Sequence, residues 1–133
     1  MSPIERKFHK AYGKVLLKLA EEDIKAAMAL HRLGDIRPEI VIFHAEQAIE
    51  KSLKGVLCWK ELPVPLLHEI SLLLQKLPPD DLPPGGYELH DLTPYATIKR
   101  YEEGVIELSQ AEIQDILLKT RKVIDWAKKK VEG

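Results

Sequence analysis

The sequence predicts an all-α protein, an antiparallel up-and-down four-helix bundle with one additional short helix. Apolar residues recur at intervals of three and four over long segments, which is typical of a helix that buries one face. No segment of four to eight residues alternates cleanly between apolar and polar side chains, as a half-buried strand would. The links between the helical segments are short and favour antiparallel neighbours. At this length, residues 1–133 are expected to form a single domain with its own core.

The first helical region lies at the N-terminus. Residues 2–5, Ser-Pro-Ile-Glu, have the form of a capping box with proline at the first helical position, so a helix is expected to begin there and to be interrupted at Gly13. From Lys14 an amphipathic helix is expected to run to Gly34, a residue type that commonly follows the last turn. Its predicted apolar face consists of Leu17, Ala20, Ile24, Ala27 and Met28.

The next helix is expected to begin at Pro38, which suits a first turn, and to end near Lys60. Its predicted core face consists of Ile42, Ala45, Ile49, Leu53 and Val56. A compact helix over 68–77 follows. Residues 78–86 hold four prolines and two glycines, so they are expected to form an exposed, mobile loop whose shortening the fold tolerates.

The C-terminal third predicts one short helix and one long one. Thr93 and Pro94 have the form of a cap and a first helical residue, and this short helix is expected to extend to about Arg100. Residues 109–112, Ser-Gln-Ala-Glu, form a second capping box. The helix that it opens is expected to bury Ile113, Ile116, Leu117, Thr120, Ile124, Ala127 and Val131.

Composition restricts the function. Lys and Arg number 20 against 21 acidic residues, and a net charge of −1 argues against a protein that holds duplex nucleic acid by charge alone. No segment is long and apolar enough to cross a membrane, and the N-terminus lacks the apolar stretch of a signal peptide. The single Cys58 cannot form an internal disulfide. A cytoplasmic protein is therefore expected.

A group of hydrogen-bond donors lies on one side of the second predicted helix. At about 100° per residue, His44, Gln47, Lys51 and Lys54 share that side. An imidazole, an amide and two ammonium groups together would suit a phosphate or an acidic partner. The alternative is a solvated face without a ligand.

Arg100 and Tyr101 form the second candidate site, because they pair a permanent cation with a stacking ring next to a flexible loop. In the alternative interpretation, Arg100 forms an ion pair with Asp23 or Glu50 and joins two helices. Asp23 itself lies among apolar neighbours and is interpreted as an ion-pair anchor rather than a catalytic acid.

A homodimer is expected from the start of the second helix. Ile40, Val41, Ile42 and Phe43 follow one another, and four consecutive helical residues cannot all face one core. No metal or other cofactor is expected, because one Cys and five scattered His residues give no ligand spacing and no glycine-rich phosphate loop follows a strand.

The sequence also resembles the HEPN domain (higher eukaryote and prokaryote nucleotide-binding). The resemblance runs from about Gly13 to Val131 and depends most on the segment Ala45–Lys54, Ala-x-x-Ala-Ile-Glu-Lys-Ser-Leu-Lys, together with Asp23, His68 and Arg100-Tyr101. It implies a bundle of four or five helices, often homodimeric, that binds a nucleotide or a partner protein. It further implies a minimal nucleotidyltransferase as partner, in a toxin–antitoxin-like pair.

Many HEPN proteins are metal-independent ribonucleases with an Arg followed by a His near the last helix junction. No His follows Arg100 here, and Arg37 and His44 lie at the wrong helix, so the ribonuclease motif is missing where the family places it. The preferred interpretation is a binding module. A ribonuclease, in which Arg100 stabilises phosphorane charge and Tyr101 or His44 moves protons, and a structural helical adaptor are the alternatives.

Overall fold

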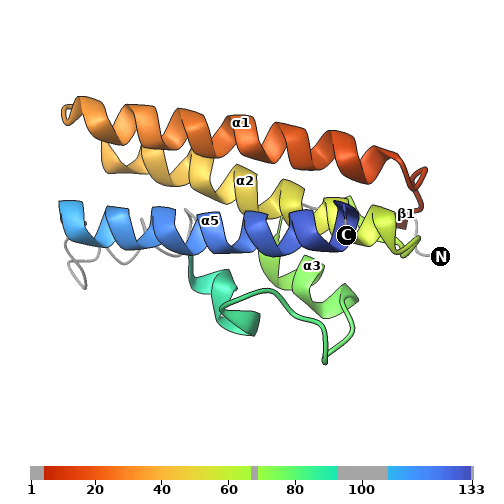
Figure 1. Cartoon of the computed structure of the whole chain (residues 1–133). Helices are drawn as coiled ribbons and strands as arrows, with labels where there is room; N and C mark the ends of the chain where they lie inside the picture. The colour runs from red at the N-terminus through yellow and green to blue at the C-terminus, as the bar shows by residue number, and fades with distance from the viewer. Residues whose placement is uncertain (1–4, 67–68, 93–107, 133) are drawn as a thin grey trace.

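The computed structural model describes residues 5–66, 69–92 and 108–132. Three long helices lie side by side (Figure 1): α1 (Tyr12–Leu33), α2 (Pro38–Trp59) and α5 (Gln110–Glu132). α1 and α2 form an antiparallel hairpin, and α5 packs against both while running in the same direction as α2. The short helix α3 (Ile70–Lys76) and the 3₁₀ helix η1 (Gly86–Leu92) lie together on one side of the long helices.

The described residues are mostly helical, which confirms the all-α class. The complete four-helix arrangement is not established, because the predicted short helix from Thr93 to about Arg100 lies outside the described residues. Among the described helices, none has a segment long and apolar enough to cross a membrane.

The apolar periods of the long helices correctly predict their buried faces. Every residue predicted for the core faces of α2 and α5 is buried. On α1 the prediction holds for four positions, but Met28 is 40% exposed. The predicted C-terminal end of α1 is confirmed at Gly34, whose φ of 82° is left-handed and whose N–H donates to the His31 carbonyl.

α1 and α2 approach each other closely at two glycines. A Cβ atom on Gly13 would lie 2.6 Å from the carbonyl oxygen of Gly55, and one on Gly55 would lie 3.0 Å from the Gly13 oxygen. Gly13 is therefore a buried packing residue inside α1. The prediction that it interrupts a helix is wrong, because its missing side chain serves the contact with α2.

The predicted helix at the N-terminus is also wrong where the structure describes it. Glu5–Arg6 form strand β1, which pairs antiparallel with β2 (Val64–Pro65). The Glu5 carboxylate forms an ion pair with Lys76 of α3. These long-range contacts hold residue 5 in an extended conformation, and α1 begins only at Tyr12.

The proline-rich segment 78–86 is irregular up to Gly85, as predicted, but it is not simply an exposed loop. Pro83 is buried and Leu82 packs against the core. Asp81 pairs at 2.8 Å with Lys60, the residue that follows α2, and at 2.5 Å with Lys130 of α5. Lys130 first, and then Lys60, lower the pKa of Asp81 from its ordinary value. The segment is thus anchored to two long helices, a connection that proline content does not indicate.

The second capping box is confirmed. The Ser109 hydroxyl accepts a hydrogen bond from the Glu112 N–H at 3.1 Å and lies 3.3 Å from the Glu112 carboxylate. This cap begins α5 at Gln110, in agreement with the sequence.

Candidate functional site

The four residues of the predicted donor group occupy one side of α2, but its two lysines are not free donors. Lys51 Nζ lies 2.6 Å from Asp23 Oδ2 of α1, and both side chains are less than one third exposed. This pair joins α1 to α2. It confirms the interpretation of Asp23 as an ion-pair anchor, with Lys51 as the cation.

Lys54 is more enclosed. Its Nζ lies 2.6 Å from Glu50 Oε1, and the Glu50 side chain is only 3% exposed. The expectation of an exposed cationic face is therefore wrong for Lys54, whose side chain is 16% exposed. Helical periodicity places Lys54 and Glu50 one turn apart. It does not predict that both side chains are largely buried on this side of α2.

His44 and Gln47 are half-buried at the other end of the same side. The His44 ring makes an edge contact with the Phe43 ring. Of the four successive apolar residues, Val41 and Ile42 are buried, while Ile40 and Phe43 are 36% and 50% exposed. Arg100 and Tyr101, the remaining predicted site residues, lie outside the described residues.

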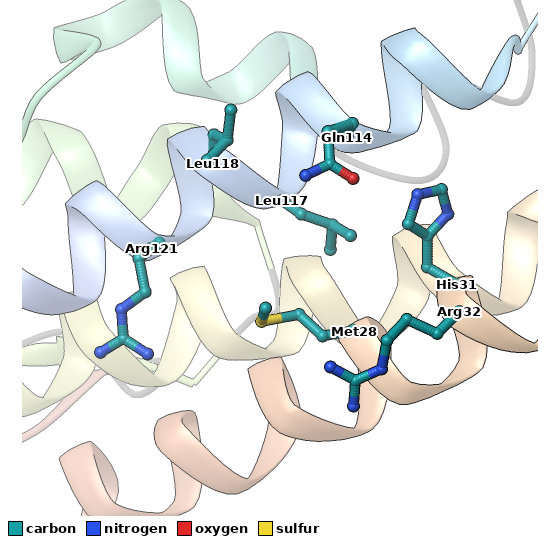
Figure 2. A pocket seen from close by; sticks show the side chains of 7 residues that line it. All are labelled: Met28, His31, Arg32, Gln114, Leu117, Leu118 and Arg121. Carbon is teal, nitrogen blue, oxygen red and sulfur yellow. The ribbon is translucent and has the colours of Figure 1, made fainter.

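A separate groove lies between α1 and α5, with a volume of about 210 Å³. Figure 2 shows Met28 and Leu117 at its centre, with Arg121 towards one end and His31 and Gln114 towards the other. Met28 and Leu118 remain 40% and 53% exposed, so the floor of the groove is an accessible apolar surface. Seven residues line it: Met28, His31, Arg32, Gln114, Leu117, Leu118 and Arg121.

The two arginines of this groove differ in their environment. The Arg121 guanidinium donates to both carboxylate oxygens of Glu21, at 2.9 and 2.5 Å, and also to Asp125. These hydrogen bonds, chiefly the one with Glu21, raise the pKa of Arg121 above its ordinary value. The Arg121 guanidinium therefore links α5 to α1 through Glu21.

Glu21 is the centre of that ion-pair cluster. It also pairs with Lys128, about two helical turns beyond Arg121 on α5. The hydrogen bond from Arg121, assisted by Lys128, lowers the pKa of Glu21 to about 2, although partial burial acts in the opposite direction. This cluster lies at one end of the groove, and its cations and carboxylates neutralise one another.

Arg32 is the available cation. It is exposed in the last turn of α1, and the structure gives it no carboxylate partner within residues 5–66, 69–92 and 108–132. His31 lines the same groove, and Gln114 adds an exposed amide from α5. A cation, an imidazole and an amide around an apolar floor can bind an anionic group attached to a flat apolar one.

The sequence contains a signal for this groove on α1 and α5. Met28, His31 and Arg32 are spaced to share one face of α1, and the lining residues of α5 follow at intervals of three and four. Such spacing identifies a face on each helix. It does not say that the two faces meet, which depends on the packing of α1 against α5.

No group of three or more His, Cys, Asp or Glu side chains in the described part of the chain is arranged to hold a metal ion. Cys58 is fully buried, and burial raises the pKa of its thiol. Neither feature supplies a reactive centre to the groove.

Comparison with known proteins gives one result. A family model described as the HEPN domain matches residues 14–131, which is most of the chain. No curated protein and no solved structure shows a significant match.

Proposed function

The chain belongs to the HEPN domain family, as the resemblance in its sequence predicts, and on this premise we propose that it is a nucleotide-binding module whose ligand lies in the groove between α1 and α5. The observation that carries the proposal is an accessible apolar floor, formed by Met28 and Leu118, beside the exposed cation of Arg32, which has no carboxylate partner among the described residues. A base would lie on the floor, while Arg32 and His31 would bind phosphate oxygens.

The predicted donor group on α2 is a less favourable site for the same ligand. His44 and Gln47 are accessible in part, but phosphate would have to compete with Asp23 for Lys51 and with Glu50 for Lys54. Replacing an existing ion pair costs more than binding a cation that water alone solvates. We therefore assign the phosphate to Arg32, and retain His44, Gln47, Lys51, Lys54, Arg100 and Tyr101 as the competing site.

The Arg32→Ala variant is expected to weaken binding of a fluorescent N-methylanthraniloyl-ADP by about tenfold, because it removes a charge-assisted hydrogen bond of about 1.5 kcal/mol. Fluorescence titration of the purified protein measures this directly. Binding should also weaken as salt is raised from 50 to 300 mM, since the contact is solvent-exposed.

The control is Arg37→Ala, which removes the same residue type from an exposed position outside the groove. It should leave the affinity within about twofold, because long-range effects of an exposed charge are screened. A loss of affinity in a Lys51→Ala/Lys54→Ala variant that remains folded, with none in Arg32→Ala, would move the ligand to α2. Metal-independent RNA cleavage that Arg100→Ala abolishes would favour the ribonuclease alternative.

We also propose that the protein is a homodimer that uses Ile40 and Phe43, the exposed apolar residues near the start of α2. Light scattering at tens of micromolar should give the mass of a dimer for the wild type and of a monomer for Ile40→Gln/Phe43→Gln, because polar side chains remove the apolar contact. The matched control is Val15→Gln/Leu33→Gln, at exposed apolar positions of α1. A wild-type monomer, or dimers of both variants, would contradict this interface.

The proposal extends to a partner protein. We propose that the HEPN module acts with a minimal nucleotidyltransferase in a toxin–antitoxin-like pair in the cytoplasm, where the single Cys58 stays reduced. Co-expression of the two proteins should give a complex that survives size-exclusion chromatography.

A further inference from the structure

His31 lies half-buried in the groove between α1 and α5, and its imidazole has no polar partner there. Within the described part of the chain the ring makes no hydrogen bond and no ion pair, and the same holds for the side chains of Arg32 and Gln114. Figure 2 shows the His31 ring and the Gln114 amide extending into the groove from its opposite walls. Three polar side chains of two helices are therefore accessible to one ligand.

The charged groups that face this imidazole are cations. Arg32 follows it in the last turn of α1, and Arg121 lies towards the other end of the groove. Glu21 and Asp125 already neutralise Arg121. Of the described residues that line the groove, none carries a carboxylate. The link after α1, the start of α2 and the first turns of α5 carry further charged side chains that do not line it: Asp35, Arg37, Glu39, Glu112, Asp115 and Lys119.

Histidine is the side chain that ordinarily changes its charge between about pH 5 and pH 8. A neutral imidazole donates one hydrogen bond, whereas a protonated one donates two and carries a charge that strengthens each of them towards phosphate. A protonated His31 beside Arg32 would place two like charges close together. A phosphate between them would replace that repulsion with two attractions, so ligand binding and protonation of the ring favour each other.

We propose that His31 makes the groove a proton-dependent site, which binds a phosphate-bearing ligand more tightly at pH 6 than at pH 8. This inference rests on the proposed nucleotide-binding function and adds a form of regulation to the same site. Because coupling between two ligands is reciprocal, a nucleotide that binds near neutral pH takes up a proton on His31.

The probe for this effect must keep its own charge constant. The terminal phosphate of ADP is a monoester that gains a proton near pH 6, which would weaken binding in the range where His31 strengthens it. N-methylanthraniloyl cyclic AMP avoids this problem, because its phosphodiester carries one negative charge throughout the range of about pH 5.5 to 8.5.

Fluorescence titration with this probe at constant ionic strength measures the affinity between pH 5.5 and 8.5. The wild type is expected to bind about fivefold more tightly at pH 5.5, the gain from a second cation at a partly exposed site. His31→Gln keeps an N–H donor but gains no proton, so its affinity should vary by less than about twofold. His31→Lys is charged throughout and should bind tightly even at pH 8.5.

The matched control is His90→Gln, because His90 is an exposed histidine of η1 outside the groove. This variant should keep the pH dependence of the wild type. Isothermal titration calorimetry at pH 6.5, in two buffers with different ionisation enthalpies, counts the protons taken up on binding. The wild type and His90→Gln should take up a fraction of a proton per ligand, and His31→Gln should take up none.

The outcomes separate this inference from the function on which it rests. Binding that Arg32→Ala weakens, but that is equally tight at every pH, would overturn the role of His31 and would still support the nucleotide groove. A pH dependence that persists in His31→Gln would overturn that role as well. If the probe bound at no pH, both proposals would be wrong. Unchanged circular dichroism and thermal midpoint in each variant exclude unfolding as the cause.

Discussion

The Gly13→Ala variant is expected to unfold about 1–3 kcal/mol more easily than the wild type, because overpacking a tight contact costs about that much. The added Cβ would lie 2.6 Å from the backbone oxygen of Gly55. That atom belongs to α2 itself and cannot turn aside like the end of a side chain. The two helices must therefore move apart, and the packing of Leu17 beside this contact must loosen.

This expectation opposes the usual effect of the substitution. Inside a helix, alanine is about 1 kcal/mol more favourable than glycine. The control is Ala29→Gly at an exposed position of α1, which measures the intrinsic preference in the same helix without a packing change. Urea denaturation followed by circular dichroism gives both free energies of unfolding. If Gly13→Ala were more stable than the wild type, the close approach of α1 and α2 would be refuted.

The second large effect concerns acid stability. Glu21→Gln is expected to lower the free energy of unfolding at pH 7 by about 1–2 kcal/mol, allowing for solvent screening of a partly exposed pair. Glu21 has a pKa of about 2 in the folded protein, against an ordinary value of 4.5, because Arg121 and Lys128 stabilise its charged form. A lowered pKa means that the unfolded chain takes up the proton first. The stabilisation is therefore complete above about pH 5 and disappears as the pH falls towards 2.

The pH profile separates this ion-pair effect from simple packing. The difference between Glu21→Gln and the wild type should be largest near pH 7 and should have almost vanished at pH 2, because Glu21 is then protonated in the unfolded chain and about half protonated in the folded protein. Glu22→Gln is the matched control, since Glu22 is exposed on the same helix. It should change stability by less than about 0.5 kcal/mol. A loss for Glu21→Gln that is equal at pH 7 and pH 2 would mean that shape, and not charge, stabilises this site.

The local sequence signals correctly predicted helix ends that depend only on residues close in sequence. The Ser109–Glu112 capping box, Pro38 at the first turn of α2 and Gly34 after α1 all lie where their local chemistry predicts. The same local logic failed at Glu5, the one residue of the first capping pattern that the structure describes, and at Gly13. There a strand partner at residues 64–65 and a neighbouring helix outweigh the capping pattern.

The candidate site shows the same division. The spacing of His44, Gln47, Lys51 and Lys54 correctly places them on one side of α2, and Asp23 was recognised as an anchor that needs a cation. Which cation it receives follows from the packing of α1 on α2, and Lys51 fills that position. The identification of Lys54 as an exposed donor failed because the enclosure of Glu50 and Lys54 comes from elements distant in the sequence.

The sequence by itself determined the helical class, the buried faces of the three long helices and the HEPN family, because periodicity, caps and a family motif are all written along the chain. Only the tertiary structure decided which charged side chains form ion pairs and which remain accessible to a ligand. Arg121 and Arg32 are alike as residues, yet Glu21 occupies one guanidinium and leaves the other exposed beside an apolar groove. That difference arises from how α1 and α5 pack, since the availability of a charge depends on its neighbours in space.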